Sequence, residues 1–272
     1  MKGSDVLAPQ GTLNVVREGA AATILLDNQK MRNAVTKDMW QQFVPTLHML
    51  GADPAVKVVV VRGAGDHFSA GADISALREI LLDQDTGRHD GGHVSAAEQA
   101  LADFPKPTIA AIDGYCAGGA WQIAGACDIR MASDRAAFGL TPAKIGIVYP
   151  LSGIQRLVRL VGPATAKFLL FSGDFIDARE AAALGLVTRV IPQDRFWPEI
   201  EAFAQRLATR SQLSIHAMKD LVDAIAEGAA DVAERSDFWQ LEMAASTDAE
   251  EGISAFLAKE APVFSWTPHR PC

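Results

Sequence analysis

Two short segments, "HFSAGADI" (67–74) and "GYCAGGAWQ" (114–122), place small residues in a turn that follows a β-rich run. In the first, the small residues at 70–72 leave backbone N–H groups open to an approaching group. In the second, Gly118 and Gly119 begin a helix, whose N-terminus offers unpaired N–H donors at the positive end of its dipole. Two such turns, each after a buried strand of one sheet, place two N–H donors on one oxygen. This is the construction of an oxyanion hole.

The side chains of these segments offer little reactivity of their own. The first polar side chain after Gly119 on the predicted helix is the amide of Gln122. An amide exchanges no proton at neutral pH and so serves neither as a general acid nor as a general base. The predicted chemistry therefore depends on backbone donors.

A sheet must hold the two turns in place, and the sequence supplies its strands. A Gly-Ala turn separates the first two β-rich runs, which therefore form a hairpin. The later runs are almost continuously apolar, as in strands covered on both faces. The predicted strands are 12–18, 21–28, 56–63, 107–114, 127–133 and 185–191.

The chain divides into a strand-rich part and a helical part. We expect a core over residues 12–192 and a helical region over 193–266 that covers another subunit. Within the core, Thr36 caps a helix with an apolar stripe, and Pro45 is expected to kink or break it. Residues 75–97 form a long loop that is either a lid or a disordered insertion.

Composition excludes several classes of protein. The net charge of −8 argues against binding to nucleic acid. No run approaches the 18 to 20 apolar residues of a membrane span, and the first residues lack the apolar core of a secretory signal, so we expect a cytoplasmic protein. Three cysteines without ligand spacing predict neither a disulfide framework nor a metal site.

Several segments together resemble the crotonase superfamily, also called the enoyl-CoA hydratase/isomerase family. They occur in the family's order and spacing, and the resemblance covers about residues 12–265. It implies an α/β fold in which ββα units wind into a spiral, with C-terminal helices that build homotrimers or homohexamers. The segments are "FSAGADI", "PTIAAIDGYCAGGA", "FGLTPAKIGI", "GLVTRVI" and "FLAKEAPVF".

The resemblance also implies a ligand and the residues that bind it. The substrate would be an acyl-coenzyme A thioester, with no cofactor beyond the coenzyme A that it carries. Its carbonyl oxygen would lie between the N–H groups of Ala70 and Gly119, which stabilise an enolate. The coenzyme A contacts implied by the resemblance are Lys30, Arg32, Ala34, Ala72, Asp73 and Ile74, with Phe256 and Lys259 contributed by a neighbouring subunit.

The sequence departs from the family's hydratases at two positions. Those enzymes carry a glutamate three residues after the oxyanion glycine and another four residues after the phenylalanine of the "FG" pair. Here these positions hold Gln122 and Pro142. The usual acid–base pair is therefore missing.

The segment around Tyr149 resembles the methylmalonyl-CoA decarboxylase branch of the family. Loss of carbon dioxide from a malonyl-type thioester gives an enolate without a catalytic base. Gln122, Thr141 and Tyr149 would orient the departing carboxylate, and decarboxylation is the favoured interpretation. The match is partial, because Ala72 stands where that branch has a histidine.

Two alternatives remain open. One is an enoyl-CoA hydratase or isomerase whose acid or base comes from the 75–98 segment, with Asp85, Asp90, His93 and Glu98 as candidates. The other is a protein that binds acyl-CoA and catalyses nothing.

Overall fold

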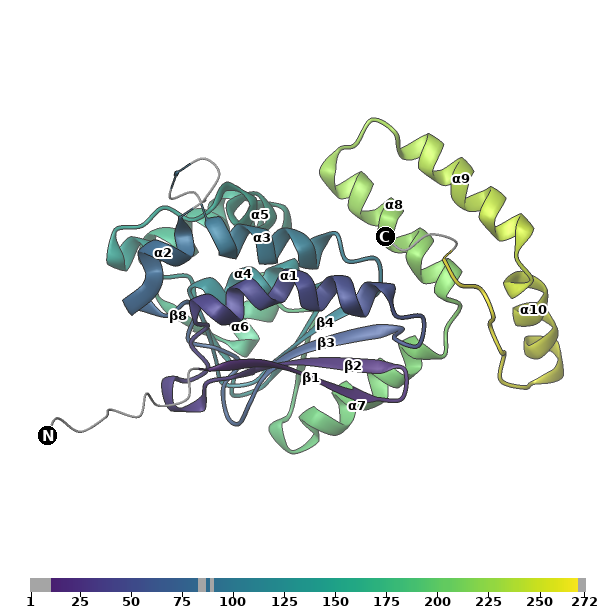
Figure 1. Cartoon of the computed structure of the whole chain (residues 1–272), viewed down its shortest axis with the longest axis horizontal. Helices are drawn as coiled ribbons and strands as arrows, with labels where there is room; N and C mark the ends of the chain where they lie inside the picture. Colours follow the sequence, from purple (N-terminus) through teal and green to yellow (C-terminus); the bar gives the residue numbers. More distant parts are fainter. Residues whose placement is uncertain (1–10, 83–86, 89–90, 269–272) are drawn as a thin grey trace, which may run out of the picture.

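The computed structural model describes residues 11–82, 87–88 and 91–268, and a six-stranded sheet forms its centre (Figure 1). The first two strands pair antiparallel as the predicted hairpin, and all later neighbours are parallel. Every predicted strand is confirmed, although the last is shorter than expected. In spatial order the strands are β1 (Thr12–Glu18), β2 (Ala21–Asp27), β3 (Val58–Gly63), β4 (Thr108–Ile112), β6 (Ile129–Ser133) and β9 (Arg189–Ile191).

A second, three-stranded sheet was not predicted. Its strands are β5 (Tyr115–Ala117), β7 (Ala137–Gly139) and β8 (Phe175–Asp177), and β7 is the central one. Each has only three residues, which is too short for an alternating pattern to be recognised. This small sheet matters for the site because β5 leads directly into Gly118 and Gly119.

Ten α-helices and four short 3-10 helices complete the described chain. The α-helices are α1 (Lys37–Ala52), α2 (Leu77–Leu81), α3 (Gly92–Ala102), α4 (Gly119–Ala126), α5 (Leu151–Ser172), α6 (Ala178–Ala183), α7 (Phe196–Ala208), α8 (Gln212–Glu227), α9 (Val232–Ala245) and α10 (Asp248–Ala258). The 3-10 helices are η1 (Gln29–Met31), η2 (Ile74–Ala76), η3 (Pro142–Ile145) and η4 (Gln193–Arg195). No helix among the described residues combines the length and the apolar character needed to cross a bilayer.

Helix α1 begins as predicted but does not break. The Thr36 hydroxyl accepts a hydrogen bond from the Met39 N–H, which satisfies one free donor of the first turn. The helix continues through Pro45 to Ala52. Pro45 is exposed, so its ring lies on the solvent side of the helix, and it leaves the carbonyl one turn before it without an N–H partner.

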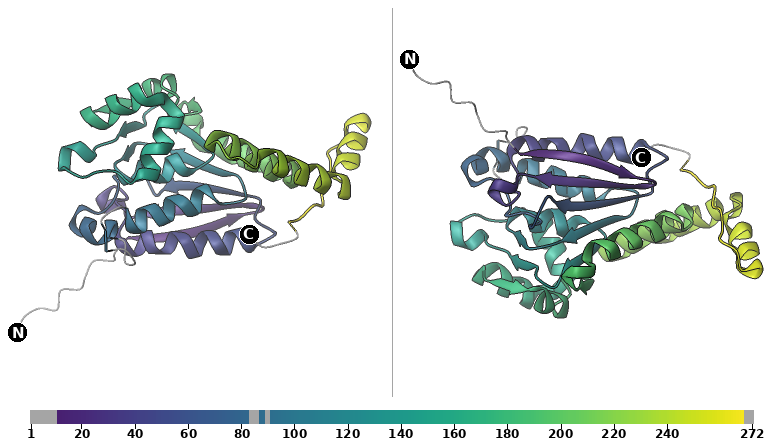
Figure 2. Two further views of the ribbon diagram at one scale, coloured as in Figure 1. Left: turned by 90° about the horizontal axis from the view of Figure 1, so that it is seen from above. Right: turned by 90° about the horizontal axis from the view of Figure 1, so that it is seen from below.

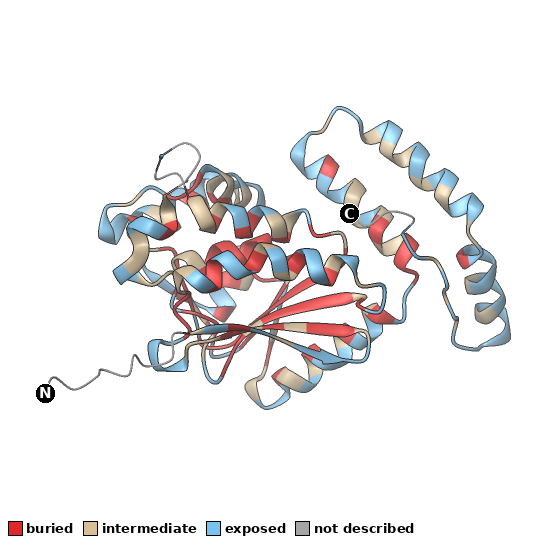
Figure 3. Ribbon diagram, viewed as in Figure 1, coloured by how far each residue is buried: buried red, intermediate tan, exposed pale blue. Residues whose placement is uncertain are grey.

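The sheet carries helices on both faces. Alternate valines of β3 point to opposite sides: Val59 and Val61 join the large core beneath α1 and α4, whereas Val58 and Val60 contact α7. Figure 3 shows the buried strands between these helical layers. The site lies on the side of the large core.

The boundary between the core and the C-terminal helical region differs from the predicted one. Helix α7, expected in the separate helical region, packs on the sheet through Phe196 and Ile200. Helices α8–α10, here called the C-terminal arm, project from the body (Figures 1 and 2). An ion pair of 2.9 Å between Lys219 and Asp128 ties α8 to the core. The arm leaves large apolar side chains exposed, including Met218, Val222, Ile225, Leu241, Ile253, Phe256 and Leu257.

The segment predicted as a long loop is partly helical. It contains α2 and the start of α3, and the turn at Gly91 fits tightly against Pro150: a Cβ on Gly91 would lie 2.7 Å from the proline ring. Asp85 and Asp90 lie outside the described residues. The prediction of a lid over 75–97 is not tested by these observations.

A buried carboxylate fixes the end of β4, where the chain turns toward the site. Arg135 donates two hydrogen bonds to Asp113, of 2.6 and 2.7 Å, and Ser133 and Gln193 donate two more. Burial alone raises the pKa of Asp113, but these hydrogen bonds outweigh it and hold the pKa below its usual value. Arg135 also donates to Asp66, so the cluster joins the chain before each of the two glycine-containing turns.

We predict that Asp113→Asn lowers the free energy of unfolding by about 2 kcal/mol at pH 7, because the Arg135 charge loses its partner but remains partly solvated. A carboxylate whose pKa is lowered by folding stabilises the protein above the unfolded-state pKa of about 4. That contribution disappears as the pH falls through the lower, folded-state value. Urea unfolding of both proteins at pH 7 and at pH 3 measures this, and an equal difference at the two pH values would contradict it.

Candidate active site

The two glycine-containing turns meet in the structure. A Cβ placed on Gly71, whose φ is +103°, would lie 2.7 Å from the Ala117 carbonyl oxygen and 3.1 Å from the Gly119 nitrogen. A Cβ on Gly119 would lie 3.3 Å from the Ala72 nitrogen. These distances bring the backbones together closely enough that only glycine fits at Gly71. The N–H groups of Ala72 and Gly119 therefore flank one small space.

The structure corrects the first donor of the predicted oxyanion hole. The Ala70 N–H donates a hydrogen bond of 2.8 Å to the Arg32 carbonyl and is not available to a substrate. The Ala72 N–H has no acceptor among the described residues. The donor pair is therefore Ala72 and Gly119.

The backbone N–H groups on either side of Ala72 are both occupied, one by Ser69 of the same turn and one by Val35 of the segment that precedes α1. The Gly71 N–H donates to the Ser69 hydroxyl at 3.0 Å, and the Asp73 N–H donates to the Val35 carbonyl at 3.0 Å. The Val35 N–H in turn donates to the Gly71 carbonyl at 2.7 Å. This arrangement fixes the backbone on both sides of Ala72 and leaves its N–H free.

Hydrogen bonds of Asn33 keep this arrangement in place. Its buried side-chain nitrogen donates to the backbone carbonyls of Ala64 and His67 at 2.8 and 2.6 Å. Its backbone carbonyl accepts a hydrogen bond from the Ser69 hydroxyl. Arg32 and Asn33 both adopt the left-handed region, with φ of 51° and 56°. Asparagine tolerates that region better than most residues with a side chain.

Gly119 is the first residue of α4, where an N–H has no partner within the helix. The helix dipole adds positive potential at this end. The preceding N–H, that of Gly118, donates to the Gly139 carbonyl of β7 at 2.8 Å. The small sheet thus fixes the start of α4.

Three buried polar atoms near this end of α4 have no hydrogen-bond partner among the described residues: Trp40 Nε1, Gln122 Oε1 and Tyr149 Oη. Thr141 is close by, since its hydroxyl would lie 3.8 Å from a Cβ on Gly118. Thr141 therefore lies beside the glycine pair and Gln122 one turn along α4, while the joint role predicted for Gln122, Thr141 and Tyr149 stays a prediction.

Burial sets the protonation of the groups behind the pocket. It raises the pKa of Tyr149 well above its usual value, and neighbouring Cys116 and Glu98 add to the effect, so the phenol keeps its proton at neutral pH. Burial also raises the pKa of Glu98, against the opposing influence of Ser152 and Arg156. These two residues donate to the two Glu98 oxygens at 2.8 and 3.2 Å.

His93 is the other described candidate for acid–base chemistry from the 75–98 segment. Partial burial lowers its pKa, so the imidazole is neutral at pH 7. Its Nε2 lies 3.2 Å from the Gln41 amide nitrogen. Within the described part of the chain, neither His93 nor Glu98 forms a hydrogen bond with Ala72 or Gly119.

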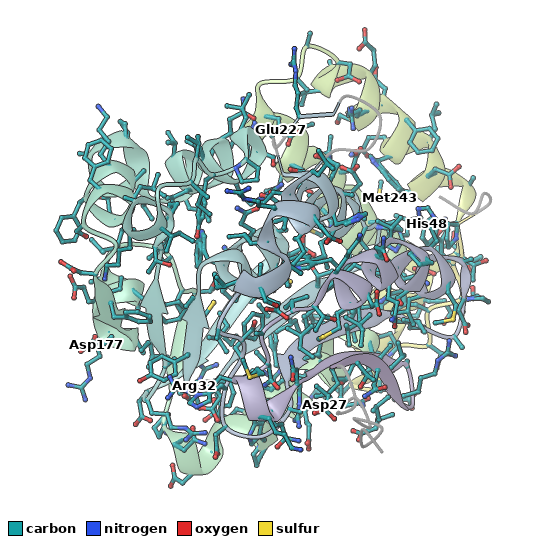
Figure 4. All side chains as sticks on the ribbon, turned by 60° about the vertical axis from the view of Figure 1, so that its left-hand side comes forward. Asp27, Arg32, His48, Asp177, Glu227 and Met243 are labelled. Carbon is teal, nitrogen blue, oxygen red and sulfur yellow. The ribbon has the colours of Figure 1, made fainter. Side chains whose placement is uncertain are left out.

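Most of the predicted coenzyme A contacts lie around the first turn. Lys30 and Arg32 are exposed, and Figure 4 labels Arg32. The Arg32 guanidinium lies over the Tyr115 ring, 5.2 Å from its centre. Ile74 is 66% exposed, and the Asp73 carboxylate accepts the Ser75 N–H, which caps η2. Ala34, in contrast, is buried in the core.

Phe256 and Lys259 do not join the site of their own chain. Phe256 lies on α10 and Lys259 ends it, at the far end of the C-terminal arm (Figure 1). Phe256 is 82% exposed, so it is accessible to another molecule. The predicted contact from a neighbouring subunit stays a prediction.

Sequence reasoning missed Trp40 as a site residue. It is buried on α1 beside Met39, and its ring carbon Cζ2 would lie 3.3 Å from a Cβ on Gly119. The only signal in the sequence is an indole next to the apolar stripe of a helix. Such a pattern is typical of an ordinary core residue.

Comparison with known proteins shows the family and the fold of the chain. The sequence pattern of the enoyl-CoA hydratase/isomerase family matches residues 17–267. A putative enoyl-CoA hydratase of Thermus thermophilus is 35% identical over 92% of this chain and 99% of its own. The 2,3-dehydroadipyl-CoA hydratase of Escherichia coli is 34% identical over 93% and 98%. A crystal structure of an enoyl-CoA hydratase/isomerase family member superposes with a TM-score of 0.91 at 46% identity, over 96% of this chain and 98% of that one. The chain therefore belongs to the enoyl-CoA hydratase/isomerase family of the crotonase superfamily, and its mixed α/β architecture is the crotonase fold.

Proposed function

We propose that the protein binds an acyl-coenzyme A thioester and stabilises its enolate between the N–H groups of Ala72 and Gly119. The observation that carries this proposal is the convergence of two unpaired backbone donors from two turns. The family to which the chain belongs supports a thioester as the ligand.

The residues act on the thioester oxygen as negative charge develops there. Because these donors are already in position, no free energy is spent on reorganising them, and they stabilise the charged enolate more than the neutral thioester. The dipole of α4 strengthens the hydrogen bond that the Gly119 N–H donates to the oxygen. The hydrogen bonds around Asn33 keep the Ala72 N–H directed at the same oxygen.

Hydration or a double-bond shift of an enoyl-CoA is the reaction that the relatives favour, because those named above are hydratases. The two positions at which the family resemblance predicts hydratase glutamates hold Gln122 and Pro142 here. This reaction therefore takes its acid or base from elsewhere. Glu98 and His93 are the described candidates. Glu98 serves as the acid or base only if its hydrogen bond with Ser152 or with Arg156 is broken.

Decarboxylation of a malonyl-type thioester is the second candidate. The observation that favours it is the absence of a carboxylate at both glutamate positions, which hold the amide of Gln122 and Pro142, together with the protonated phenol of Tyr149. Gln122, Thr141 and Tyr149 would hold the carboxylate while the carbon–carbon bond breaks. The bonding electrons pass to the enolate, and the hole stabilises it without a base.

The C-terminal arm supports a further part of the proposal, a homotrimer or homohexamer. Its apolar side chains, Phe256 among them, are exposed in the single chain. Contact with another copy would cover them.

We predict that Gly71→Ala lowers kcat/KM by about 100-fold or more, the effect of losing one oxyanion donor. The new Cβ meets the Ala117 carbonyl at 2.7 Å and forces the two turns apart. Gly19→Ala is the matched control: its φ of +62° gives similar backbone strain, but nothing lies within 4 Å of the added Cβ. If both variants lose activity equally, backbone strain and not the hole explains the loss.

The two reactions are separated by a substrate panel. We expect the protein to convert either crotonyl-CoA to a hydrated or isomerised product, or malonyl-type thioesters to carbon dioxide, with each product measured by chromatography and mass spectrometry. Gly71→Ala should slow whichever conversion occurs by about 100-fold or more. Tight binding of both substrates without any product would overturn catalysis and leave an acyl-CoA-binding protein.

A further inference from the structure

A pocket of about 150 Å³ lies between α7 and strands β1–β3, on the face of the sheet away from the oxyanion donors. Figure 1 shows α7 on the opposite side of the sheet from α1 and α4. Apolar side chains form much of the wall, with Leu25 and Val60 from the sheet and Ile200 and Ala204 from the helix. An apolar cavity of about this volume in another protein holds a molecule as large as benzene. The pocket is therefore large enough for a small organic ligand.

Arg62 brings a positive charge into this pocket. Val58 and Val60 of β3 point to the α7 face, and the alternation of the strand directs Arg62 to the same face. The guanidinium carbon lies over the Trp197 ring, 4.1 Å from its centre. The indole therefore covers one face of the guanidinium. The N–H groups of Arg62 point outward in the guanidinium plane, so this contact leaves them free to donate.

Arg62 has no anionic partner in the part of the chain that the structure describes. Its Nε is buried without a hydrogen-bond partner, and no carboxylate forms an ion pair with it. In contrast, the buried Arg130 donates to two backbone carbonyls, and Arg156 donates to Glu98. Buried donors in folded proteins nearly always have a partner. The N–H edge of Arg62 therefore requires an acceptor that these residues do not supply.

Two glutamates that line the pocket do not neutralise this charge. Glu18 and Glu201 are both exposed to solvent, and neither is paired with Arg62. Water and salt screen charges at such positions. The charge that a ligand meets inside the pocket is therefore that of the guanidinium.

We propose that this pocket binds a small organic acid, with the carboxylate on the N–H edge of Arg62 and the hydrocarbon part between the sheet and α7. A carboxylate matches the planar fork of a guanidinium through two parallel hydrogen bonds. An inorganic anion would leave the apolar walls uncovered, and a neutral hydrocarbon would leave Arg62 unpaired. A compact molecule that carries both groups satisfies both. This site is separate from the proposed thioester site and does not depend on it.

The experiment compares benzoate, benzamide and formate by isothermal titration calorimetry in a Tris buffer that contains no carboxylate. Benzamide has the shape of benzoate without its charge, and formate has the carboxylate without the ring. Because hydrogen bonds to a charged acceptor are the stronger ones, we expect benzoate to bind about tenfold more tightly than benzamide. Burial of the ring should make benzoate bind at least about tenfold more tightly than formate.

Three variants assign the binding to Arg62. Arg62→Met keeps the length of the side chain without its charge and should abolish the preference for benzoate over benzamide. Arg62→Lys keeps the charge without the planar fork and should reduce that preference by about threefold. Arg206→Met is the matched control, because Arg206 also lies over a ring of α7, 5.5 Å from the centre of Phe203, but does not line the pocket. It should leave all three Kd values unchanged.

Urea unfolding establishes that each variant is folded, and Arg62→Lys decides the assignment if Arg62→Met does not fold. The proposal is overturned if the wild-type protein binds no benzoate, which would leave Arg62 as a residue that only stacks on Trp197. Equal affinity for benzoate and benzamide, or for benzoate and formate, also overturns it. So does a preference for benzoate that survives intact in the Arg62 variants, because the ligand then lies elsewhere. None of these results depends on whether the protein converts an acyl-coenzyme A.

Discussion

Four hydrogen bonds between residues 32–35 and 69–73 are the constraint on which the site depends. They occupy the backbone on both sides of Ala72 and leave its N–H as the free donor of that turn. Gly71 then lets the turn approach the start of α4, where Gly119 has a free N–H for a different reason, its position at a helix terminus. One donor is freed by tertiary hydrogen bonds and the other by secondary structure.

The pocket beside these donors is polar without being ionic. Gln122 replaces a carboxylate, Tyr149 keeps its proton, and the buried carboxylate of Glu98 is engaged by α5. Such a pocket orients a substrate by hydrogen bonds, while the backbone stabilises charge. Proton transfer, where a reaction needs it, then falls to a group outside the two usual glutamate positions. Stabilisation of the enolate therefore needs no ionisable side chain.

The sequence predicts what local pattern controls and misses what distant contacts decide. Apolar runs and the glycine-containing turns predicted the six-stranded sheet and the meeting of two donors. The prediction of Ala70 as the first donor is wrong, because the Ala70 N–H donates to the carbonyl of Arg32, which is distant in sequence. The small sheet escaped notice because its strands are too short for a pattern. Trp40 escaped because a buried indole looks the same in sequence whether its N–H faces a ligand or not.

The most direct test of the central claim is a crystal structure of the protein with butyryl-CoA bound. The account predicts that the thioester oxygen lies about 2.7–3.1 Å from both the Ala72 and the Gly119 nitrogens. A thioester oxygen within hydrogen-bond distance of neither nitrogen, or bound instead at the Ala70 N–H after loss of its contact with Arg32, would contradict it.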